Sequence, residues 1–296
     1  DWPKGPIRWV VAYAAGGAAD TVARNMGARV SEILGVQVLI DNRTGGNSVV
    51  AQSAVAQAPK DGQTFLVDAA NQLTNEHLVK DAPFNYEKNW LPVTLMSTFP
   101  QVVAVKDEFP AKTIQEYIAA AKAKPDAIRY ASAGIGNQSH LAAEIFAGTI
   151  GAQMLHVAYK GVGPMVTDLL AGRIEMTFIG INVVQQHVAA GKLQVLATTS
   201  SKRSPLSADL PTMSEAGLPG FAAGTWYGIL APAGTPAGVV DKLSGEFARI
   251  LAMPDFRERL LAEGMDPFFT TPAQFSSLIR SDAARFANVI RSAKIR

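Results

Sequence analysis

The sequence of 296 residues predicts an α/β protein with two domains. Short apolar strands alternate with amphipathic helices along most of the chain, which is typical of parallel βαβ units. A loop of small residues follows a strand once in each half, so the two halves resemble each other in organisation. The length fits about two domains of roughly 100–200 residues each.

The first half opens with a strand that runs into a loop of Ala and Gly at residues 14–19. Asp20 follows this loop and is expected to be the N-cap of the next helix. Apolar residues then recur at helical spacing from Val22 to Leu34. The predicted elements are strands at residues 7–13, 36–41 and 64–68 and helices at residues 22–34 and 48–58.

The second half repeats this rhythm, with a small-residue loop at residues 133–137. Pro164 suits the first position of a helix, where its missing N–H costs nothing. The predicted elements are strands at residues 102–105, 128–132, 153–157, 174–179 and 194–199 and helices at residues 113–122, 138–149 and 164–171.

The pattern breaks over residues 200–221, where Pro205, Pro211 and Pro219 favour an irregular linker between the lobes. A strand at residues 225–230 and helices at residues 240–253, 255–263 and 272–293 complete the chain. One apolar stripe at helical spacing is expected to be core: Val239, Val240, Leu243, Phe247, Ile250 and Leu251.

Composition excludes several classes of protein. The formal net charge is only +2 and the basic residues are scattered, whereas a nucleic-acid binder usually has a clustered basic excess. The absence of cysteine excludes disulfides, thiolate metal sites and a cysteine nucleophile. The four histidines, at positions 77, 140, 156 and 187, are far apart and show neither pairing at i, i+4 nor a carboxylate partner at ligand spacing, so we expect no metal and no cofactor.

The two small-residue loops predict anion binding. Each stands between a strand and a helix, where the first backbone amides of the helix are unpaired and no side chain obstructs them. The helix dipole adds roughly half a positive charge there, so a carboxylate can be held without Lys or Arg. One loop in each lobe would place two sets of donors across a cleft. The alternative is that both loops are ordinary tight turns.

Neither loop fits a nucleotide motif, because both lack the Lys-Ser/Thr of a P-loop and a complete G-x-G-x-x-G, which leaves dinucleotide binding as a weak alternative. Asp20 would suit a ligand ammonium, but capping of its own helix is favoured. Ser132 is not in a G-x-S-x-G nucleophile elbow.

Polar side chains at the edges of the loops are candidates for the wall of the cleft, although ordinary loop polarity would also explain them. They are Tyr13, Asn71, Ser132, Asn137, Tyr159 and Asn182. Trp226 and Tyr227 are expected either in the core or in this wall.

Eight short motifs in this order and spacing carry a family resemblance over nearly the whole chain. They are YAAGGAAD at residues 13–20, DNRTGG at 41–46, PKDGQT at 59–64, SAGIG at 132–136, YKG at 159–161, GKL at 191–193, PTMSEAG at 211–217 and APAGTP at 231–236. Together they resemble the Bug-type solute receptors of tripartite tricarboxylate transporters.

This resemblance implies a type II periplasmic binding-protein fold that closes over a ligand in a cleft between two lobes. Lobe 1 would comprise residues 1–100 and 223–296, and lobe 2 residues 101–222. It also implies a carboxylate held by loop amides, with contacts from both lobes. The implied contacts are Ala15, Gly16, Gly17, Ala18 and Ala19 in lobe 1, and Ser132, Ala133, Gly134 and Asn137 in lobe 2.

The implied protein is a monomeric periplasmic receptor, not an enzyme, whose partner is the membrane permease of the transporter. Any export signal would already be absent, since residues 1–6 run almost directly into a strand. The rival interpretations are an α/β enzyme that uses Ser132 or Asp20, and a ligand-sensing regulatory module, which would need a helix-turn-helix that this chain does not show.

The chain departs from the family where relatives often carry an Asp after the strand that ends near Phe178. Here residues 179–182 offer no acid. Because an unpaired buried ammonium is costly, we expect a ligand without an amine, either a small dicarboxylate or an aromatic carboxylate.

Overall fold

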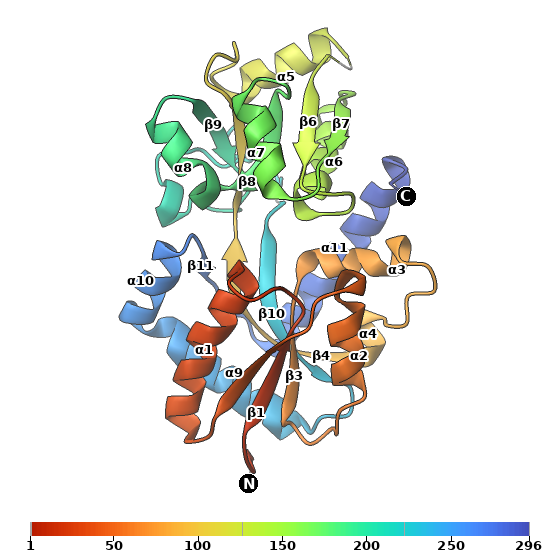
Figure 1. Cartoon of the computed structure of the whole chain (residues 1–296), viewed down its shortest axis with the longest axis vertical. Coiled ribbons are helices and arrows are strands. Elements are labelled where there is room, and N and C mark those ends of the chain that lie inside the picture. Colours follow the sequence, from red (N-terminus) through yellow and green to blue (C-terminus); the bar gives the residue numbers. More distant parts are fainter. Residues whose placement is uncertain (1, 126, 222, 296) are drawn as a thin grey trace. The chain divides into compact units, whose positions relative to one another are not determined.

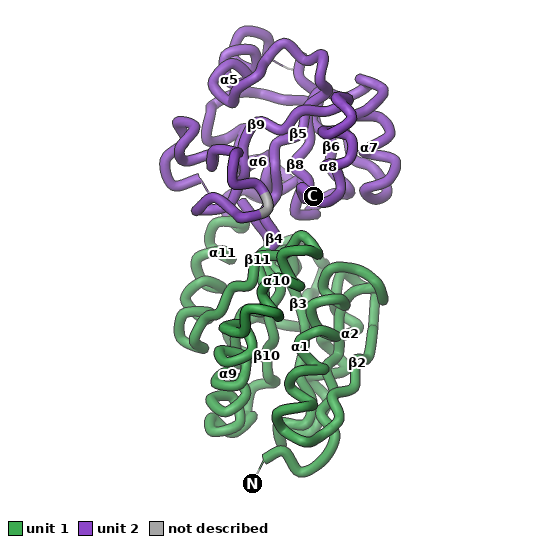
Figure 2. The backbone as a smooth tube through the Cα atoms, turned by 90° about the vertical axis from the view of Figure 1, so that its left-hand side faces the viewer, with its two compact units in different colours: residues 1–98, 226–287 green, residues 99–225, 288–296 purple. Residues whose placement is uncertain are grey.

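The computed structural model describes residues 2–125, 127–221 and 223–295. It divides into two compact units (Figure 2): unit 1 comprises residues 1–98 and 226–287, and unit 2 comprises residues 99–225 and 288–296. Each unit contains one mixed β-sheet packed with helices (Figure 1), which confirms the predicted α/β class. The chain from residue 288 onward, expected in the first lobe, groups with unit 2. None of the described helices is long and apolar enough to cross a membrane.

The sheet of unit 1 has the strand order β11-β4-β10-β3-β1-β2. β1 pairs in parallel with β2 and β3, so the carboxyl ends of these three strands meet at one edge. β10 pairs antiparallel to β3. The elements of this unit are β1 (Ile7–Val11), α1 (Ala18–Leu34), β2 (Val38–Asn42), α2 (Val49–Ala56), β3 (Thr64–Ala69), α3 (Asn75–Leu78), α4 (Tyr86–Asn89), β4 (Trp90–Phe99), β10 (Thr225–Pro232), α9 (Ala237–Ala252), α10 (Pro254–Ala262), β11 (Asp266–Pro267) and α11 (Pro272–Ser292).

The apolar stripe of α9 lies in the core of unit 1, as predicted. All six of its residues are buried, and the Phe247 ring stacks on Trp9 of β1 with the centroids 5.6 Å apart. On β10, Trp226 is buried and packs edge-on against Phe275 of α11, while its indole N–H donates to Asp282. Trp226 is therefore a core residue that fastens α11 to the sheet.

The sheet of unit 2 has the strand order β7-β6-β8-β5-β9. β6 is parallel to both β7 and β8, whereas β5 is antiparallel to β8 and β9. The elements of this unit are β5 (Gln101–Lys106), α5 (Ile114–Ala123), β6 (Arg129–Ser132), α6 (Gln138–Ile150), β7 (Leu155–Ala158), α7 (Val162–Leu170), β8 (Met176–Gly180), α8 (Ile181–Ala189) and β9 (Leu193–Thr198).

Unit 2 buries apolar side chains on both faces of its sheet. Val103 and Val105 of β5 pack into a cluster with Phe146 of α6, and Val102 and Ala104 into another with α7 and α8. This alternation follows from the two-residue period of a strand. A sheet covered on both sides exposes its loops at the carboxyl ends of β6, β7 and β8, where a ligand can reach them.

Two sequence predictions about this fold were wrong, and two elements were not predicted. Residues 200–221 are not a linker, because Met213 and Phe221 are buried in the core of unit 2. Pro164 is the third residue of α7 and not the first, since the helix begins at Val162 after Gly161. The pattern also does not predict β4, which contains Pro92, or α8, which begins directly after β8 without a turn.

Candidate functional site

The N-terminus of α1 in unit 1 is open, in the sense that its first main-chain amides are not capped. Gly17 is the N-cap residue and has no side chain that could accept from the first turn. Among the residues that the structure describes, no acceptor meets the amides of Ala18, Ala19 and Asp20. The amide of Gly17, in contrast, donates to the Ala14 carbonyl at 3.3 Å. Three adjacent N–H groups are thus free to bind an anion.

Asp20 is not the N-cap, contrary to prediction, but the third residue of α1. Its carboxylate reaches back to the Gly16 amide (2.9 Å) and also accepts from Arg24 Nε (2.9 Å) and Asn42 Nδ2 (2.9 Å). Burial raises the pKa of this carboxyl, but these hydrogen bonds more than offset the effect and the pKa lies below its usual value. Asp20 therefore links Gly16 to the first turn of α1, and its carboxylate is already bonded to three donors.

Tyr13 and Asn71 lie together at the carboxyl edge of β1 and β3, as the parallel pairing requires. The Tyr13 hydroxyl accepts from Gln72 Nε2 at 2.9 Å, and it lies 3.3 Å from both Asn71 Oδ1 and Asp68 Oδ1. Its ring meets Tyr227 edge-on, at 6.3 Å between centroids. Tyr13 is thus held in place beside the open end of α1.

Asp68 is a buried carboxylate that the sequence analysis missed. It has no exposed surface, and it accepts from Ser48 Oγ, Gln52 Nε2, the Tyr86 hydroxyl and the amide of Ala69. Burial raises the pKa of Asp68 to about 6, although the four donors work against this shift. A sequence signal existed, because Asp68 is the one charged residue in the fully buried strand β3.

In unit 2, the loop of residues 133–137 leads from β6 to α6. Asn137 is the N-cap of α6 and its side chain accepts from the Ser139 amide at 2.7 Å. Ser139 Oγ in turn accepts from the Ala133 amide at 3.0 Å, and the Asn137 amide donates to the Gly134 carbonyl. Among the described residues, the amides of Gln138 and His140 have no acceptor. More of the main-chain amides of this loop are therefore hydrogen-bonded within the loop and its helix than in the loop of unit 1.

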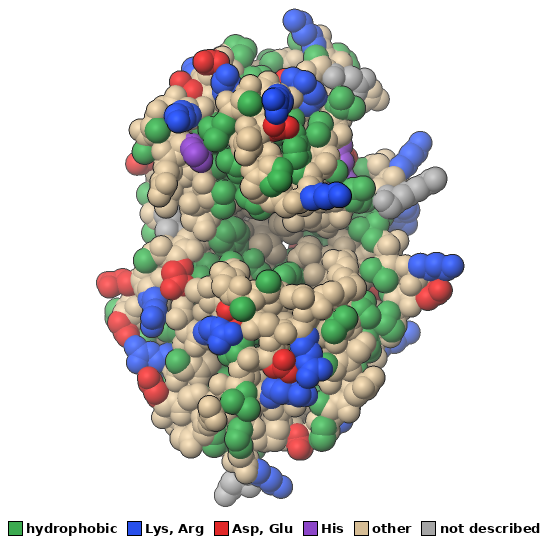
Figure 3. Space-filling view, viewed as in Figure 1, with side chains coloured by type: hydrophobic (Ala, Val, Ile, Leu, Met, Phe, Trp, Pro, Cys, Tyr) green, Lys and Arg blue, Asp and Glu red, His purple; other side chains and the backbone are tan. Residues whose placement is uncertain are grey.

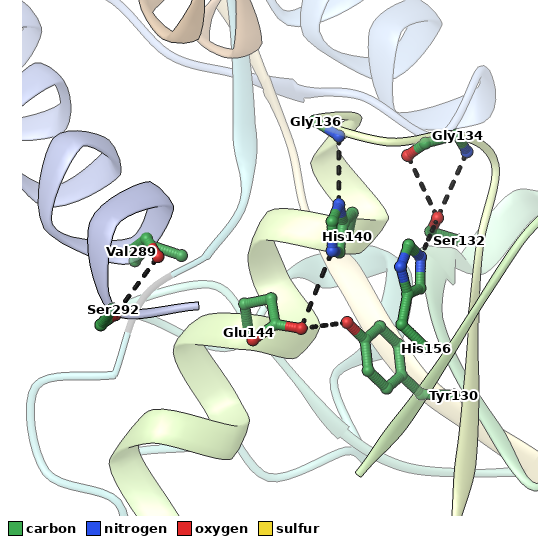
Figure 4. A network of polar contacts seen from close by, with 9 residues as sticks. All are labelled: Tyr130, Ser132, Gly134, Gly136, His140, Glu144, His156, Val289 and Ser292. Atoms are coloured by element: carbon green, nitrogen blue, oxygen red, sulfur yellow. Dashed lines mark hydrogen bonds and ion pairs between the residues drawn. The ribbon is translucent and has the colours of Figure 1, made fainter. Parts of the chain in front are cut away.

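Ser132, predicted to contact the ligand, is completely buried. Its hydroxyl lies 2.7 Å from His156 Nε2, donates to the Gly134 carbonyl and accepts from the Gly134 amide (Figure 4). A serine next to a histidine is also found in hydrolases, but this oxygen has no access to a substrate. Ser132 supports the loop from within.

The prediction that the histidines are far apart and lack a carboxylate partner was wrong. The rings of His140 and His156 stack with centroids 3.9 Å apart, and His140 Nε2 lies 3.7 Å from Glu144 of the same helix, at i, i+4 (Figure 4). His140 Nδ1 accepts from the Gly136 amide at 3.1 Å. Burial and the neighbouring His140 lower the pKa of His156 to about 4.

Tyr159 and Asn182 follow β7 and β8, on either side of the β6 loop in the sheet order. The Tyr159 hydroxyl donates to Asp168 at 2.7 Å, and burial together with this carboxylate raises the pKa of Tyr159 to about 12. Asn182 is exposed in the first turn of α8.

Side chains of opposite charge are interspersed over the face of the molecule shown in Figure 3, and not gathered by sign. Within the described ranges, no three His, Asp or Glu side chains are placed to hold a metal ion. The chemistry available at both loops is therefore that of hydrogen-bond donors.

Comparisons with known proteins agree with these features. Residues 22–295 match the tripartite tricarboxylate transporter family receptor model. A UPF0065 protein from the tcbD-tcbE intergenic region of Pseudomonas sp. strain P51 is 35% identical, over 98% of this chain and 86% of its own. BugT of Bordetella pertussis is 30% identical, over 98% of this chain and 90% of its own.

Solved structures are similar over nearly the whole chain. Rpa4515 of R. palustris with adipate has a TM-score of 0.82 at 31% identity and covers 100% of this chain and 99% of its own. MatC of Rhodopseudomonas palustris with bound malate has a TM-score of 0.77 at 30% identity and covers 98% and 100%. The periplasmic binding protein BugD has a TM-score of 0.78 at 32% identity and covers 100% and 99%. These similarities confirm the periplasmic binding-protein fold, and the chain belongs to the family of tripartite tricarboxylate transporter receptors, which are solute-binding proteins and not enzymes.

Proposed function

We propose that this protein captures a small carboxylate without an amine in the periplasm and delivers it to the permease of a tripartite tricarboxylate-type transporter. The observation that carries the proposal is the open N-terminus of α1, where the amides of Ala18, Ala19 and Asp20 have no acceptor among the described residues. Three convergent donors and the positive end of a helix dipole suit one carboxylate group.

We infer the ligand contacts from the loops at the carboxyl ends of the parallel strands. In unit 1 they are the main chain of residues 15–19 with Tyr13 and Asn71, which are held beside that loop. In unit 2 they are the main chain of residues 133–137, with Tyr159 and Asn182 at the neighbouring strand ends. We propose that closure of the two units brings both sets onto one ligand.

A ligand without an amine is supported by the state of the carboxylates near the strand ends. Asp20 accepts from Gly16, Arg24 and Asn42, and Asp68 is completely buried and accepts from four donors. Asp168 is paired with Arg173 and Tyr159. An ammonium would have to compete with the partners that these carboxylates already have. The adipate and malate in the two similar structures are both dicarboxylates that lack an amine.

Malate and aspartate test this most sharply, because they differ only by a hydroxyl in place of the ammonium. The protein is first unfolded and refolded to remove retained molecules, and then titrated by calorimetry with malate, aspartate, adipate, 2-aminoadipate and benzoate. We expect binding of a carboxylate from the amine-free group and recovery of that ligand unchanged. A preference for either amino acid over its amine-free analogue would overturn the ligand class, and turnover of any of these compounds would overturn the receptor function.

A further inference from the structure

Two histidines are linked by hydrogen bonds to the loop of residues 133–137, and each is linked to a different glycine of the loop. Gly134 and Gly136 have φ angles of +151° and +70°, which side-chain-bearing residues rarely adopt. His140 contacts Gly136 directly, and His156 reaches Gly134 through Ser132 (Figure 4). Because the two rings stack on each other, the two histidines form a single unit.

The hydrogen bond from Gly136 defines which nitrogen of the His140 ring carries the hydrogen. His140 Nδ1 accepts from the Gly136 amide, so its hydrogen is on Nε2, which faces Glu144. Ser132 has one hydroxyl hydrogen, which can go either to the Gly134 carbonyl at 3.1 Å or to His156 Nε2 at 2.7 Å. Each histidine therefore has a different partner: His140 accepts from a loop amide, and His156 contacts the serine that accepts from the other loop amide.

The network is anchored in the core. Glu144 accepts from the Tyr130 hydroxyl and lies next to His140, and the ring of Tyr130 stacks on His156 at 4.9 Å between centroids. Tyr130, Ser132 and His140 are at most 4% exposed. Buried polar groups that are fully paired fix a unique arrangement, whereas removal of one partner leaves an unsatisfied donor or acceptor.

We propose that His140 and His156 are positioning residues for ligand capture: they hold the main chain of residues 134–136 in the conformation that binds the carboxylate ligand. This inference rests on the proposed function of that loop. Neither histidine has to touch the ligand. The amides of Gly134 and Gly136 are used in holding the loop. The contribution of the two histidines is to fix the course of the loop into α6. The amides of Gln138 and His140, which have no acceptor among the described residues, are thereby oriented before the ligand arrives, which lowers the entropic cost of binding.

Substitutions at His140 separate the hydrogen bond from the packing. His140→Asn places Oδ1 near the position of Nδ1 and keeps an acceptor for the Gly136 amide, but it loses the stacked ring. His140→Phe keeps a ring of similar size on His156, but it leaves the Gly136 amide without an acceptor. Adipate and malate affinities and melting temperatures are measured for both variants and the unchanged protein.

We expect His140→Phe to weaken binding of the preferred ligand by about tenfold or more and His140→Asn by less than about threefold, whatever the order of their melting temperatures. At the second histidine, His156→Gln keeps a hydrogen-bonding group at the position of Nε2 and should bind better than His156→Phe. Affinities that simply follow the melting temperatures, or equal affinities in the Asn and Phe variants, would overturn the proposal. If the unchanged protein binds no carboxylate at all, the proposed function fails instead.

Discussion

Replacement of Asp68 by Asn changes how the stability of the protein depends on pH. The carboxyl group is completely buried, and burial raises its pKa from 3.8 to about 6. A raised pKa means that the folded state holds the proton more tightly than the unfolded state. The stability contributed by Asp68 is thus fully present below about pH 4 and is lost as the pH rises through 6.

The size of this loss follows from the shift. A difference of about 2 pKa units at about 1.4 kcal/mol per unit gives about 3 kcal/mol in total, most of which is lost between pH 4 and pH 7. The amide side chain of the Asp68→Asn variant would not titrate. Any constant effect of the substitution, such as an altered hydrogen bond to Tyr86, therefore cancels when the two pH values are compared.

The assay is urea unfolding of both proteins at several pH values from 4 to 7.5. We expect the free energy of unfolding of Asp68→Asn relative to the original protein to increase by about 2–3 kcal/mol across this range. Ser207→Ala, in unit 2, is the control and should show a constant difference. A constant difference for Asp68→Asn as well would refute the buried, proton-binding role of Asp68.

Three further predictions concern other parts of the molecule. Because the pKa of His156 is lowered to about 4, protonation of His156 opposes folding, and the free energy of unfolding should fall as the pH drops from about 6.5 to 4. In urea titrations, His156→Gln should remove at most about 2 kcal/mol of this pH dependence, since His156 is partly exposed. Gly228→Ala should lower the free energy of unfolding by about 1–3 kcal/mol, because the new Cβ would lie 2.4 Å from Phe275 Cζ. Gly245→Ala in α9, where nothing lies within 4 Å, should instead raise it by up to about 1 kcal/mol; a loss of stability there would contradict the open surroundings.

Much of the fold was predictable because its elements carry strong periodic patterns. The stripe of α9 is buried as expected, and each small-residue loop does stand between a parallel strand and a helix. The pattern failed at β4 and at residues 200–221, where prolines suggest irregular chain. At residues 200–221, the burial of Met213 and Phe221 in the core of unit 2 decides the structure, and local sequence does not predict this tertiary packing.

The site was predictable at the level of loops but not of individual hydrogen bonds. Asp20 follows the glycines as an N-cap residue would, yet the helix begins two residues before it, so its carboxylate binds back to Gly16. The pairing of His140 with His156 depends on the register of β6 and β7 and on the direction of α6, which one sequence without its fold does not supply. Glu144, at i+4 from His140, was the available signal.

The open N-terminus of α1 is tested most directly by calorimetric titration of adipate and malate into Gly17→Asp and Gly17→Ala. Both variants meet the same contact, since a Cβ at position 17 would lie 3.3 Å from the Ala14 carbonyl. Only the Asp variant adds a carboxylate, which would cap the free amides and repel an anionic ligand. We predict that the Ala variant retains binding while the Asp variant loses more than about 100-fold in affinity. Equal affinities in the two variants would contradict the assignment of this helix end as the carboxylate site.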